Sequence, residues 1–343
     1  MTTTPHPLVV RARQLADGLL SPDAERVDQT QVPAGHIAAI KRSGLLGLGA
    51  PEEYGGSAAP AGVARETAEI LAGACCSTWF VQTQHHTPVA TLVKGAEPVR
   101  QRLLGPMARG ELLSGVAYAH LRAHPRTPVR VVRERGGWRF DGTVPWYTGW
   151  GLNDVMLLAG VTDGGEALFA FTEARERPGM RASPPMRLAA LTAARTVSLE
   201  LDGMWLPEEA VAVRTPYEQW AAGDRPKTVA ASPAVFGVTE AALGLVDDAV
   251  AGPLRARLAE IRSRAYALAD EAAPHEHLDE RLALRLRSYE VMRAATTAAV
   301  VSGGGRSMAV TSKAQRLARE AMFLLVQGQT AQSRRAHLDA LAS

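Results

Sequence analysis

Apolar residues near the start of the chain recur every three to four positions. Leu8, Ala12, Leu15 and Leu19 follow this spacing, which is typical of an amphipathic helix. The same period continues through the first third of the chain, where glycines and prolines divide it into segments. It predicts further helices over residues 32–43, 62–71, 77–93 and 98–108. The third of these is largely apolar, so we expect it to lie centrally.

The period changes to two between about residues 114 and 213. Trp138 and Phe140 alternate there with Arg139 and Asp141, which predicts a strand with one buried face. Residues 196–202 alternate in the same way, and shorter apolar runs end at glycine, aspartate or proline. The predicted turns lie at residues 136–137, 163–165 and 202–203.

Helical spacing returns at about residue 226 and continues to the end of the chain. Proline or glycine separates the predicted helices, which cover residues 229–251, 254–270, 278–301, 312–327 and 331–341. We therefore expect an α+β fold with helices first, then strands, then helices. Its predicted parts are an N-terminal helical domain (1–112), a middle antiparallel β domain (113–213) and a C-terminal helical bundle (214–343).

Composition narrows the class of protein. Hydrophobic residues make up 46% and charged residues 21% of the 343 residues; these are globular values and exclude a mainly disordered chain. The 38 basic and 35 acidic residues leave a net charge of +3, and no basic block is concentrated anywhere. We therefore expect no nucleic-acid partner.

The two cysteines and the apolar runs bear on the surroundings of the protein. Cys75 and Cys76 are adjacent, a spacing that suits neither a disulfide nor a metal site, so we expect buried thiols, a reducing compartment and no metal. The first residues lack the charged start and apolar core of a signal peptide. The longest apolar stretches are too short to span a bilayer. These features predict a cytoplasmic protein without a membrane segment.

Five motifs follow one another along the chain. The first contains Pro51-Glu52-Glu53-Tyr54-Gly55-Gly56, and the others lie at residues 103–111, 138–149, 206–209 and 316–330. In this order they resemble the acyl-CoA dehydrogenase superfamily of flavoproteins, over nearly the whole chain. The resemblance implies the same order of helices and strands that the periodicity predicts, and it implies bound FAD.

The resemblance assigns several residues to this cofactor. In the family, the aromatic ring and the hydroxyl of a Trp-Ile-Thr turn contact the flavin, and the corresponding residues here are Trp146 and Thr148. The alternative is that Trp146 is a packed strand residue and Thr148 an ordinary turn residue. Further cofactor positions implied by the resemblance are Tyr118, Gly303, Gly304, Thr330 and Gln332.

Two departures from the family pattern concern the cofactor. The family carries a Thr-Glu-Pro segment whose threonine touches the flavin, and Leu121 stands in the place of that threonine. The family also carries an Arg-Lys-x-Phe-Gly loop that reaches the adenosine part of the cofactor bound to a neighbouring subunit. Residues 250–254 are expected to join two helices directly, without that loop.

A third departure concerns the catalytic base. Acyl-CoA dehydrogenases remove an α-proton with a glutamate, usually in a Tyr-Glu-Gly-Thr segment near the C-terminus. That glutamate falls on Gln327 or Gly328, depending on register, and neither residue is a useful base at physiological pH. A minority of the family places the glutamate where this chain has Lys227. We therefore expect the ordinary dehydrogenase reaction to be weak or absent.

Histidines are the candidate substitutes for the missing base. His85 and His86 follow on the helix that faces the active site in the family, and monooxygenases of the same fold place a histidine there. A pair of core histidines is the alternative, because two neighbours on a helix point in different directions. His120 and Glu320 are weaker candidates, and an ion pair with Arg316 is the structural alternative for Glu320.

Three functions stay open on the sequence. The first is an acyl-CoA-dehydrogenase-like, FAD-dependent oxidoreductase that acts on an acyl thioester or related small molecule and passes electrons to an electron-transfer flavoprotein. The second is a flavin-dependent monooxygenase that receives reduced flavin from a flavin reductase. The third is a non-catalytic homologue that pairs with an active subunit. The apolar C-terminal helices, residues 229–251 above all, also predict a homodimer or homotetramer.

Overall fold

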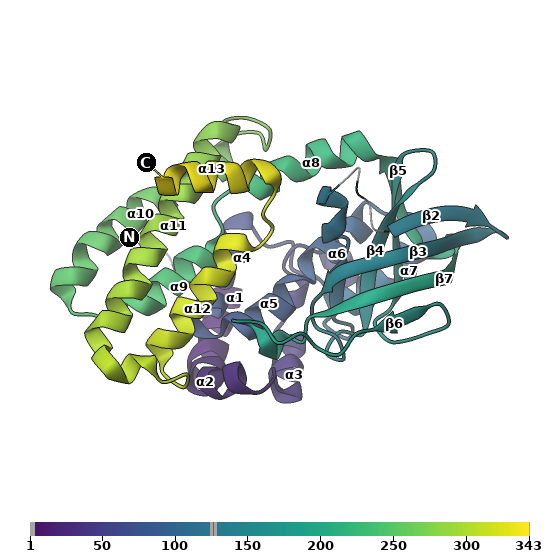
Figure 1. Cartoon of the computed structure of the whole chain (residues 1–343). Coiled ribbons are helices and arrows are strands. Elements are labelled where there is room, and N and C mark those ends of the chain that lie inside the picture. Colours follow the sequence, from purple (N-terminus) through teal and green to yellow (C-terminus); the bar gives the residue numbers. More distant parts are fainter. Residues whose placement is uncertain (1–3, 124–125, 127–128, 343) are drawn as a thin grey trace.

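The computed structural model of the protein describes residues 4–123, 126 and 129–342. Most helices fill one half of the molecule, where N-terminal and C-terminal helices pack together, and the strands fill the other half, where the helices of residues 86–108 pack against the sheet (Figure 1). The last N-terminal helix ends at Ala108, the strands run from Ser114 to Pro216, and the C-terminal helices begin at Tyr217. The predicted α, β, α order is confirmed.

The N-terminal helices occupy the predicted stretches with two differences, the first of which is α2 (Ser21–Gln29), a helix that was not predicted. The helix expected over residues 77–93 is divided into α5 (Cys76–Thr83) and α6 (His86–Val93). Pro88 explains the break, because a proline lacks a backbone donor and its ring crowds the carbonyl four residues earlier, that of Gln84. The other helices of this part are α1 (Pro7–Leu15), α2 (Ser21–Gln29), α3 (Ala34–Arg42), α4 (Ala61–Ala74) and α7 (Glu97–Ala108).

The strands form one sheet in the order β6-β7-β3-β2-β4-β5-β8, with β1 beside β4. The predicted antiparallel domain is mixed at two places, since β4 runs parallel to both β1 and β2. β4 follows the β2–β3 hairpin but lies on the far side of β2, so it points the same way as β2. The strands are β1 (Ser114–Ala117), β2 (Val129–Glu134), β3 (Gly137–Tyr147), β4 (Val155–Thr162), β5 (Glu166–Glu173), β6 (Met180–Ala182), β7 (Val197–Pro207) and β8 (Val211–Pro216).

The turn expected at residues 202–203 is instead a bulge within β7. The register between β3 and β7 shifts at this point, and both strands continue past it. Gly203 has a φ of +67° and its N–H donates to Asp141 Oδ1 at 2.8 Å. One type of β-bulge requires a glycine with positive φ. Gly203, from which the turn was predicted, therefore forms a bulge within the strand and does not end it.

The C-terminal helices differ from the prediction around Pro253. This proline was expected to separate two helices but lies inside α10 (Asp248–Glu271), near its start, where it removes one backbone donor. The link between helices is therefore residues 244–247, which also leave no room for the family's cofactor loop. The other helices are α8 (Tyr217–Val229), α9 (Pro233–Leu243), α11 (Leu278–Gly303), α12 (Lys313–Val326) and α13 (Ala331–Ala342).

The apolar helix expected to drive self-association is buried inside the chain. α9 packs against α4 so closely that a Cβ on Gly237 would lie 2.0 Å from the carbonyl oxygen of Glu69. That part of the argument for an oligomer is wrong, because one chain buries this helix by itself. Exposed apolar side chains of the C-terminal part lie instead on α11, α12 and the segment between them, at Val301, Met308, Val310, Met322 and Val326, and on α10 and α13, at Val250, Leu338 and Leu341.

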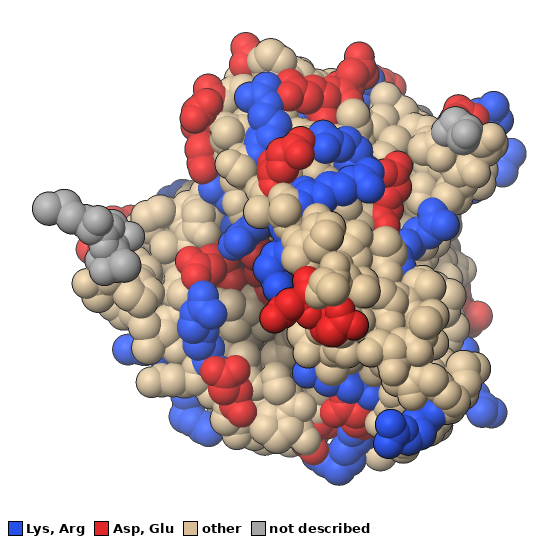
Figure 2. Space-filling view, turned by 90° about the vertical axis from the view of Figure 1, so that its left-hand side faces the viewer, with Lys and Arg blue, Asp and Glu red and all other residues tan. Residues whose placement is uncertain are grey.

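Charges of both signs mix on the side of the molecule where α10 and α11 lie (Figure 2). Several of them are ion pairs between these two helices, such as Arg264–Glu280 at 2.6 Å and Arg257–Glu290 at 2.9 Å. This face therefore carries no continuous basic surface. None of the described helices combines the length and apolarity needed to cross a membrane.

Candidate functional site

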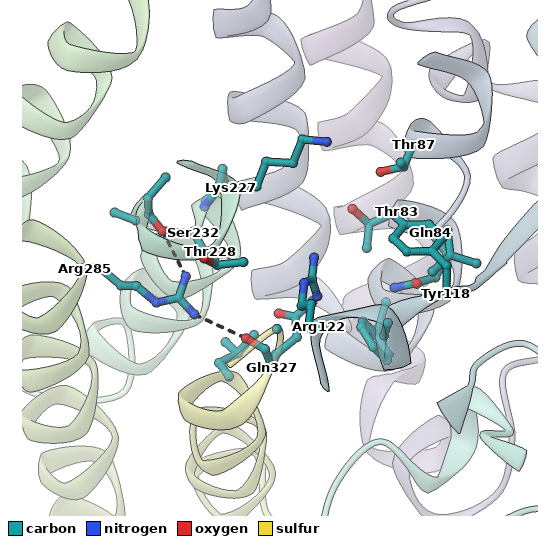
Figure 3. A pocket seen from close by; sticks show the side chains of 18 residues that line it. Thr83, Gln84, Thr87, Tyr118, Arg122, Lys227, Thr228, Ser232, Arg285 and Gln327 are labelled. Carbon is teal, nitrogen blue, oxygen red and sulfur yellow. Dashed lines mark hydrogen bonds between the residues drawn. The ribbon is translucent and has the colours of Figure 1, made fainter. Parts of the chain in front are cut away.

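A cavity of about 470 Å³ lies where the three parts of the chain meet. Its walls come from α5 and α6, from the segment after β1, and from the C-terminal helices (Figure 3). The residues that line it are Phe80, Thr83, Gln84, Thr87, Val116, Tyr118, Ala119, Arg122, Lys227, Thr228, Ala230, Ala231, Ser232, Pro233, Arg285, Leu324, Gln327 and Gly328.

The end of α12 brings Gln327 to this cavity. The helix stops there, and Gly328 follows with a φ of +64°, a conformation that glycine adopts without strain. This favours the register in which Gly328 matches the family's glycine and Gln327 its glutamate. Lys227, the other position where the family has a glutamate, lines the same cavity. The structure thus brings together both positions, and neither is acidic.

Arg122 and Lys227 line the cavity from two different elements. Arg122 belongs to the 3-10 turn Ala119–Ala123, and its guanidinium donates to both carboxylate oxygens of Asp224 on α8, at 2.7 and 3.0 Å. Lys227 follows Asp224 on α8 and extends over the cavity (Figure 3). None of the described residues that line the cavity carries a carboxylate, and the described part of the chain gives Arg122, but not Lys227, an acidic partner in Asp224.

Arg285 reaches the cavity from α11 and is only 6% exposed. Its guanidinium donates to two backbone carbonyls, that of Ala230 at 2.9 Å and that of Gln327 at 3.2 Å. It also stacks over the ring of Tyr289, 5.1 Å from the centroid. These contacts fix the end of α12 against the loop before α9, and among the described residues they pair Arg285 with neutral groups only.

Tyr118, a predicted cofactor contact, lines the cavity with its side chain. Burial raises the pKa of its phenol, although a hydrogen bond with Thr87 acts in the opposite direction. The hydroxyl is therefore protonated at neutral pH. With Thr83 on the facing helix, it gives this wall of the cavity hydroxyl groups that can donate or accept.

The predicted catalytic histidines lie at the junction of α5 and α6, outside the lining. His85 is buried, and its Nδ1 accepts a hydrogen bond from the backbone N–H of Ser114 at 3.0 Å; Nε2 of His86 lies 2.7 Å from Nε2 of Gln82. Burial lowers the pKa of His85 to about 3 and that of His86 to about 4. Both rings are neutral at neutral pH and are weak bases, and their catalytic role stays a prediction.

The two weaker candidates are held by structural contacts. Nε2 of His120 lies 3.0 Å from the carbonyl oxygen of Ala159, and burial lowers its pKa to about 4. Glu320 is buried and accepts from Nη1 of Arg316 at 2.8 Å with each carboxylate oxygen. The ion pair expected as the structural alternative for Glu320 is therefore confirmed.

The residues predicted to contact the flavin ring are partly suited to it. Trp146, at the end of β3, is 54% exposed and so is not a packed core residue. Thr148 is nearly buried, with its hydroxyl 3.1 Å from that of Thr196. Leu121 is fully buried between the sheet and α6–α7, where it offers no polar contact. An exposed indole and a nearby hydroxyl fit a flavin ring, and the contact from position 121 is lost.

The remaining predicted cofactor positions lie elsewhere in the chain. Gly303 lines a separate cavity of about 310 Å³ beside Lys313, at the start of α12, whereas Gln327 lies past its end. A helix of 14 residues is about 21 Å long, so Gly303 and its neighbour Gly304 lie far from Gln327. Thr330 accepts from the Ser333 N–H at 3.2 Å and so caps α13, and Gln332 is exposed. One chain does not bring all of these residues together.

The sequence interpretation missed Arg122 and Arg285 as site residues. Arg285 stands on the same face of α11 as Ser288 and Met292, three and seven residues later, and both are buried. The helical spacing alone places this arginine on the buried face of the helix, and such a position could have marked it as a site residue. Arg122 carried no comparable signal, because its partner Asp224 is remote in sequence.

Comparison with known proteins identifies one family. Residues 6–111 match the family model "Acyl-CoA dehydrogenase, N-terminal domain". The short-chain specific acyl-CoA dehydrogenase of Clostridium acetobutylicum is 23% identical over 206 residues, which are 57% of this chain and 54% of that protein. The chain thus spans about half the length of the curated relatives it matches.

Solved structures match nearly the whole chain. A glutaryl-CoA dehydrogenase from Mycobacterium smegmatis in complex with FADH2 has a TM-score of 0.81 and 17% identity, covering 97% of this chain and 93% of that one. Dibenzothiophene monooxygenase from Paenibacillus sp. A11-2 has a TM-score of 0.79 and 17% identity, covering 97% and 96%. These matches show the fold, which the two enzymes share despite their different names.

Proposed function

Because the chain belongs to the acyl-CoA dehydrogenase superfamily, we propose that it is a flavin-dependent oxidoreductase whose small-molecule substrate binds in the cavity at the end of α12. One observation carries this proposal: Gln327 and Lys227, the two places where members of the family have their glutamate, line the same cavity. They lie on elements far apart in the sequence, so their meeting supports an active site at this place in the fold.

The chemistry of this cavity differs from that of an ordinary acyl-CoA dehydrogenase. An amide and an ammonium group stand where a carboxylate would remove the α-proton, and none of the lining residues that the structure describes is acidic. General-base catalysis typically contributes on the order of 10²–10⁴ in rate. We therefore expect weak turnover of straight-chain acyl thioesters, whose α-proton needs such a base.

Flavin binding is part of the proposal. Trp146 and Thr148 would hold the flavin ring, and the backbone of Tyr118 would add a contact to the cofactor. Bound FAD would supply a hydride acceptor. Gly303 and Gly304 lie too far away in the same chain, so they would serve the cofactor of a second copy, in a homodimer or homotetramer.

A flavin-dependent monooxygenase is the second candidate. The lack of an acidic residue in the described lining favours a monooxygenase, because the monooxygenase reaction does not begin with removal of an α-proton by a carboxylate. The two candidates differ in their partners, which are an electron-transfer flavoprotein for a dehydrogenase and a flavin reductase for a monooxygenase. A non-catalytic homologue that pairs with an active subunit is the remaining possibility for a chain without this base.

The test begins with the absorbance spectrum of the purified protein and identification of any released flavin. Turnover is then measured with short, medium and branched acyl-CoA and an artificial electron acceptor. We expect little activity in the wild type and a gain in Gln327→Glu, which returns a carboxylate to the cavity. Gln329→Glu adds the same charge two residues further on, outside the lining, and is the matched control.

The outcomes separate the candidates. Robust wild-type turnover would contradict the inferred lack of a base and direct the search to His85 and His86. A colourless protein that binds reduced flavin and oxygenates a substrate would support the monooxygenase. A protein that binds neither oxidised nor reduced flavin would overturn the proposed oxidoreductase. Gly328→Glu is the poorer rescue, since a side chain at φ +64° is strained.

A further inference from the structure

The charge of the cavity does not suit a purely apolar substrate. Arg122, Lys227 and Arg285 line it, and one carboxylate, that of Asp224, neutralises Arg122. Lys227 and Arg285 have no carboxylate partner among the described residues. An acyl chain that displaced water from this space would leave the buried Arg285 without solvent or a counter-ion and would place an apolar group beside Lys227, which is costly.

Arg285 is the stronger indication of an anion. A buried cation is normally paired with a carboxylate, and removal of such a partner typically destabilises a protein strongly. Arg285 is 6% exposed, yet its hydrogen bonds go to the carbonyls of Ala230 and Gln327. The guanidinium has five N–H donors, so these two bonds leave donors unused beside the cavity. Its planar shape suits a carboxylate.

The rest of the lining is apolar or neutral. Phe80, Val116 and Leu324 give it apolar surface, and the ring of Phe80 packs edge-on against Phe323, 4.8 Å between centroids. Thr83 and Thr87 lie across from Arg122 and Lys227 (Figure 3). A volume of about 470 Å³ is within the range of small-molecule pockets. The lining therefore fits a small molecule with one charged end and one apolar part.

We propose that this cavity binds an organic carboxylate, with its charged group at Arg285 and its apolar part against Phe80 and Leu324, while Lys227 adds positive charge to the same cavity. The proposal rests on the proposed function only in taking this cavity as the substrate site, and it requires neither flavin nor turnover. It makes charge, and not chain length, the first determinant of which substrates enter.

Isothermal titration of the full chain tests this with three probes. Phenylacetate carries the carboxylate and an apolar ring, phenylacetamide is its neutral counterpart, and inorganic phosphate is an anion without the apolar part. We expect phenylacetate to bind at least about tenfold more tightly than phenylacetamide, because a hydrogen bond to a charged group contributes strongly. Tighter binding of phosphate than of phenylacetate would overturn the organic carboxylate as the ligand.

Variants locate the binding site. Lys227→Met and Arg285→Gln are each expected to weaken phenylacetate by about tenfold and to leave phenylacetamide unchanged. Arg225→Met is the matched control, since Arg225 is an exposed residue of the same helix outside the lining. Lys227 is exposed, so its variant remains informative if Arg285→Gln fails to fold.

The results are independent of the oxidoreductase test. Equal affinity for phenylacetate and phenylacetamide, or full affinity in Lys227→Met, would overturn the carboxylate site even in a protein that reduces its flavin. Charge-selective binding lost in Lys227→Met but kept in Arg225→Met would support it even in a protein without flavin or turnover.

Discussion

Lowering the pH from 7.5 to 5.0 is expected to destabilise the fold through three histidines. Burial lowers the pKa of His85 to about 3 and the pKa values of His86 and His120 to about 4. The histidine pKa values of the unfolded chain are about 6.5. Below this pH the unfolded chain therefore binds more protons than the folded chain does. The neutral rings therefore stabilise the fold above pH 6.5, and this contribution is lost as the pH falls toward their folded values.

The size of the effect follows from the pKa difference. One pKa unit corresponds to about 1.4 kcal/mol, and pH 5.0 lies about 1.5 units below the unfolded value, so each histidine loses about 2 kcal/mol. The three together lose about 6 kcal/mol. This is comparable with the whole stability of a typical domain, about 5–15 kcal/mol.

Urea unfolding followed by circular dichroism at pH 7.5, 6.5, 5.5 and 5.0 measures the loss. His85→Asn removes the titrating ring and keeps an oxygen that can accept from the Ser114 N–H. We expect this variant to be less stable at pH 7.5 but to lose about 2 kcal/mol less than the wild type by pH 5.0. His275→Asn, at an exposed position, is the control and should follow the wild-type pH dependence.

The result that would refute this reasoning is a wild-type free energy of unfolding that changes by less than about 1 kcal/mol between pH 7.5 and 5.0. A His85→Asn variant with the full wild-type pH dependence would likewise show that His85 does not titrate as its burial requires. In either case the argument that these histidines are weak bases would fall, and their catalytic role would gain support.

Three further predictions concern packing and assembly. Glu320→Ala leaves Arg316 buried without its closest partner and should cost about 3–5 kcal/mol in urea unfolding, whereas Asp339→Ala removes an exposed pair with Arg335 and should cost less than about 1 kcal/mol; equal costs would contradict this. Gly237→Ala places a Cβ against the Glu69 carbonyl and should lower the melting temperature, while Gly252→Ala, with open space around it, should not; a harmless Gly237→Ala would show that the helices can separate freely. We also expect a homodimer or homotetramer in sedimentation analysis that Val301→Glu with Met322→Glu converts to smaller species, unlike Val10→Glu on α1; a wild-type monomer at micromolar concentration would rule this out.

The sequence by itself determined the order of the helical and strand parts and many of their elements. The alternation of Trp138, Arg139, Phe140 and Asp141 reports two strand faces because side-chain direction in a strand has a period of two, and β3 buries Trp138 and Phe140 as that pattern requires. The three-to-four spacing of the first helix likewise depends on a local geometry. The Arg316–Glu320 pair was also local, since residues four apart on a helix are neighbours.

Local signals were ambiguous where one residue type serves two structures. Gly203 supplies a positive φ, which both a turn and a bulge can use, and only the pairing of β7 with β3 selects the bulge. Pro253 and Pro88 both lack a backbone donor. The first is accommodated near the start of α10, and the second divides the central helix, because its position decides which carbonyl it crowds.

The candidate site was decided by tertiary structure. The sequence shows that Gln327 and Lys227 occupy the two positions where the family has its glutamate. Only the packing of α8, α11 and α12 around one cavity brings these two residues together and adds Arg285 to the lining. Whether a charged residue has a counter-ion depends on residues far away in the chain, so no spacing reveals that Arg122 is paired with Asp224 and that Arg285 meets only backbone carbonyls. Periodicity reports which face of an element is buried; the electrostatics of a cavity depend on which elements meet there.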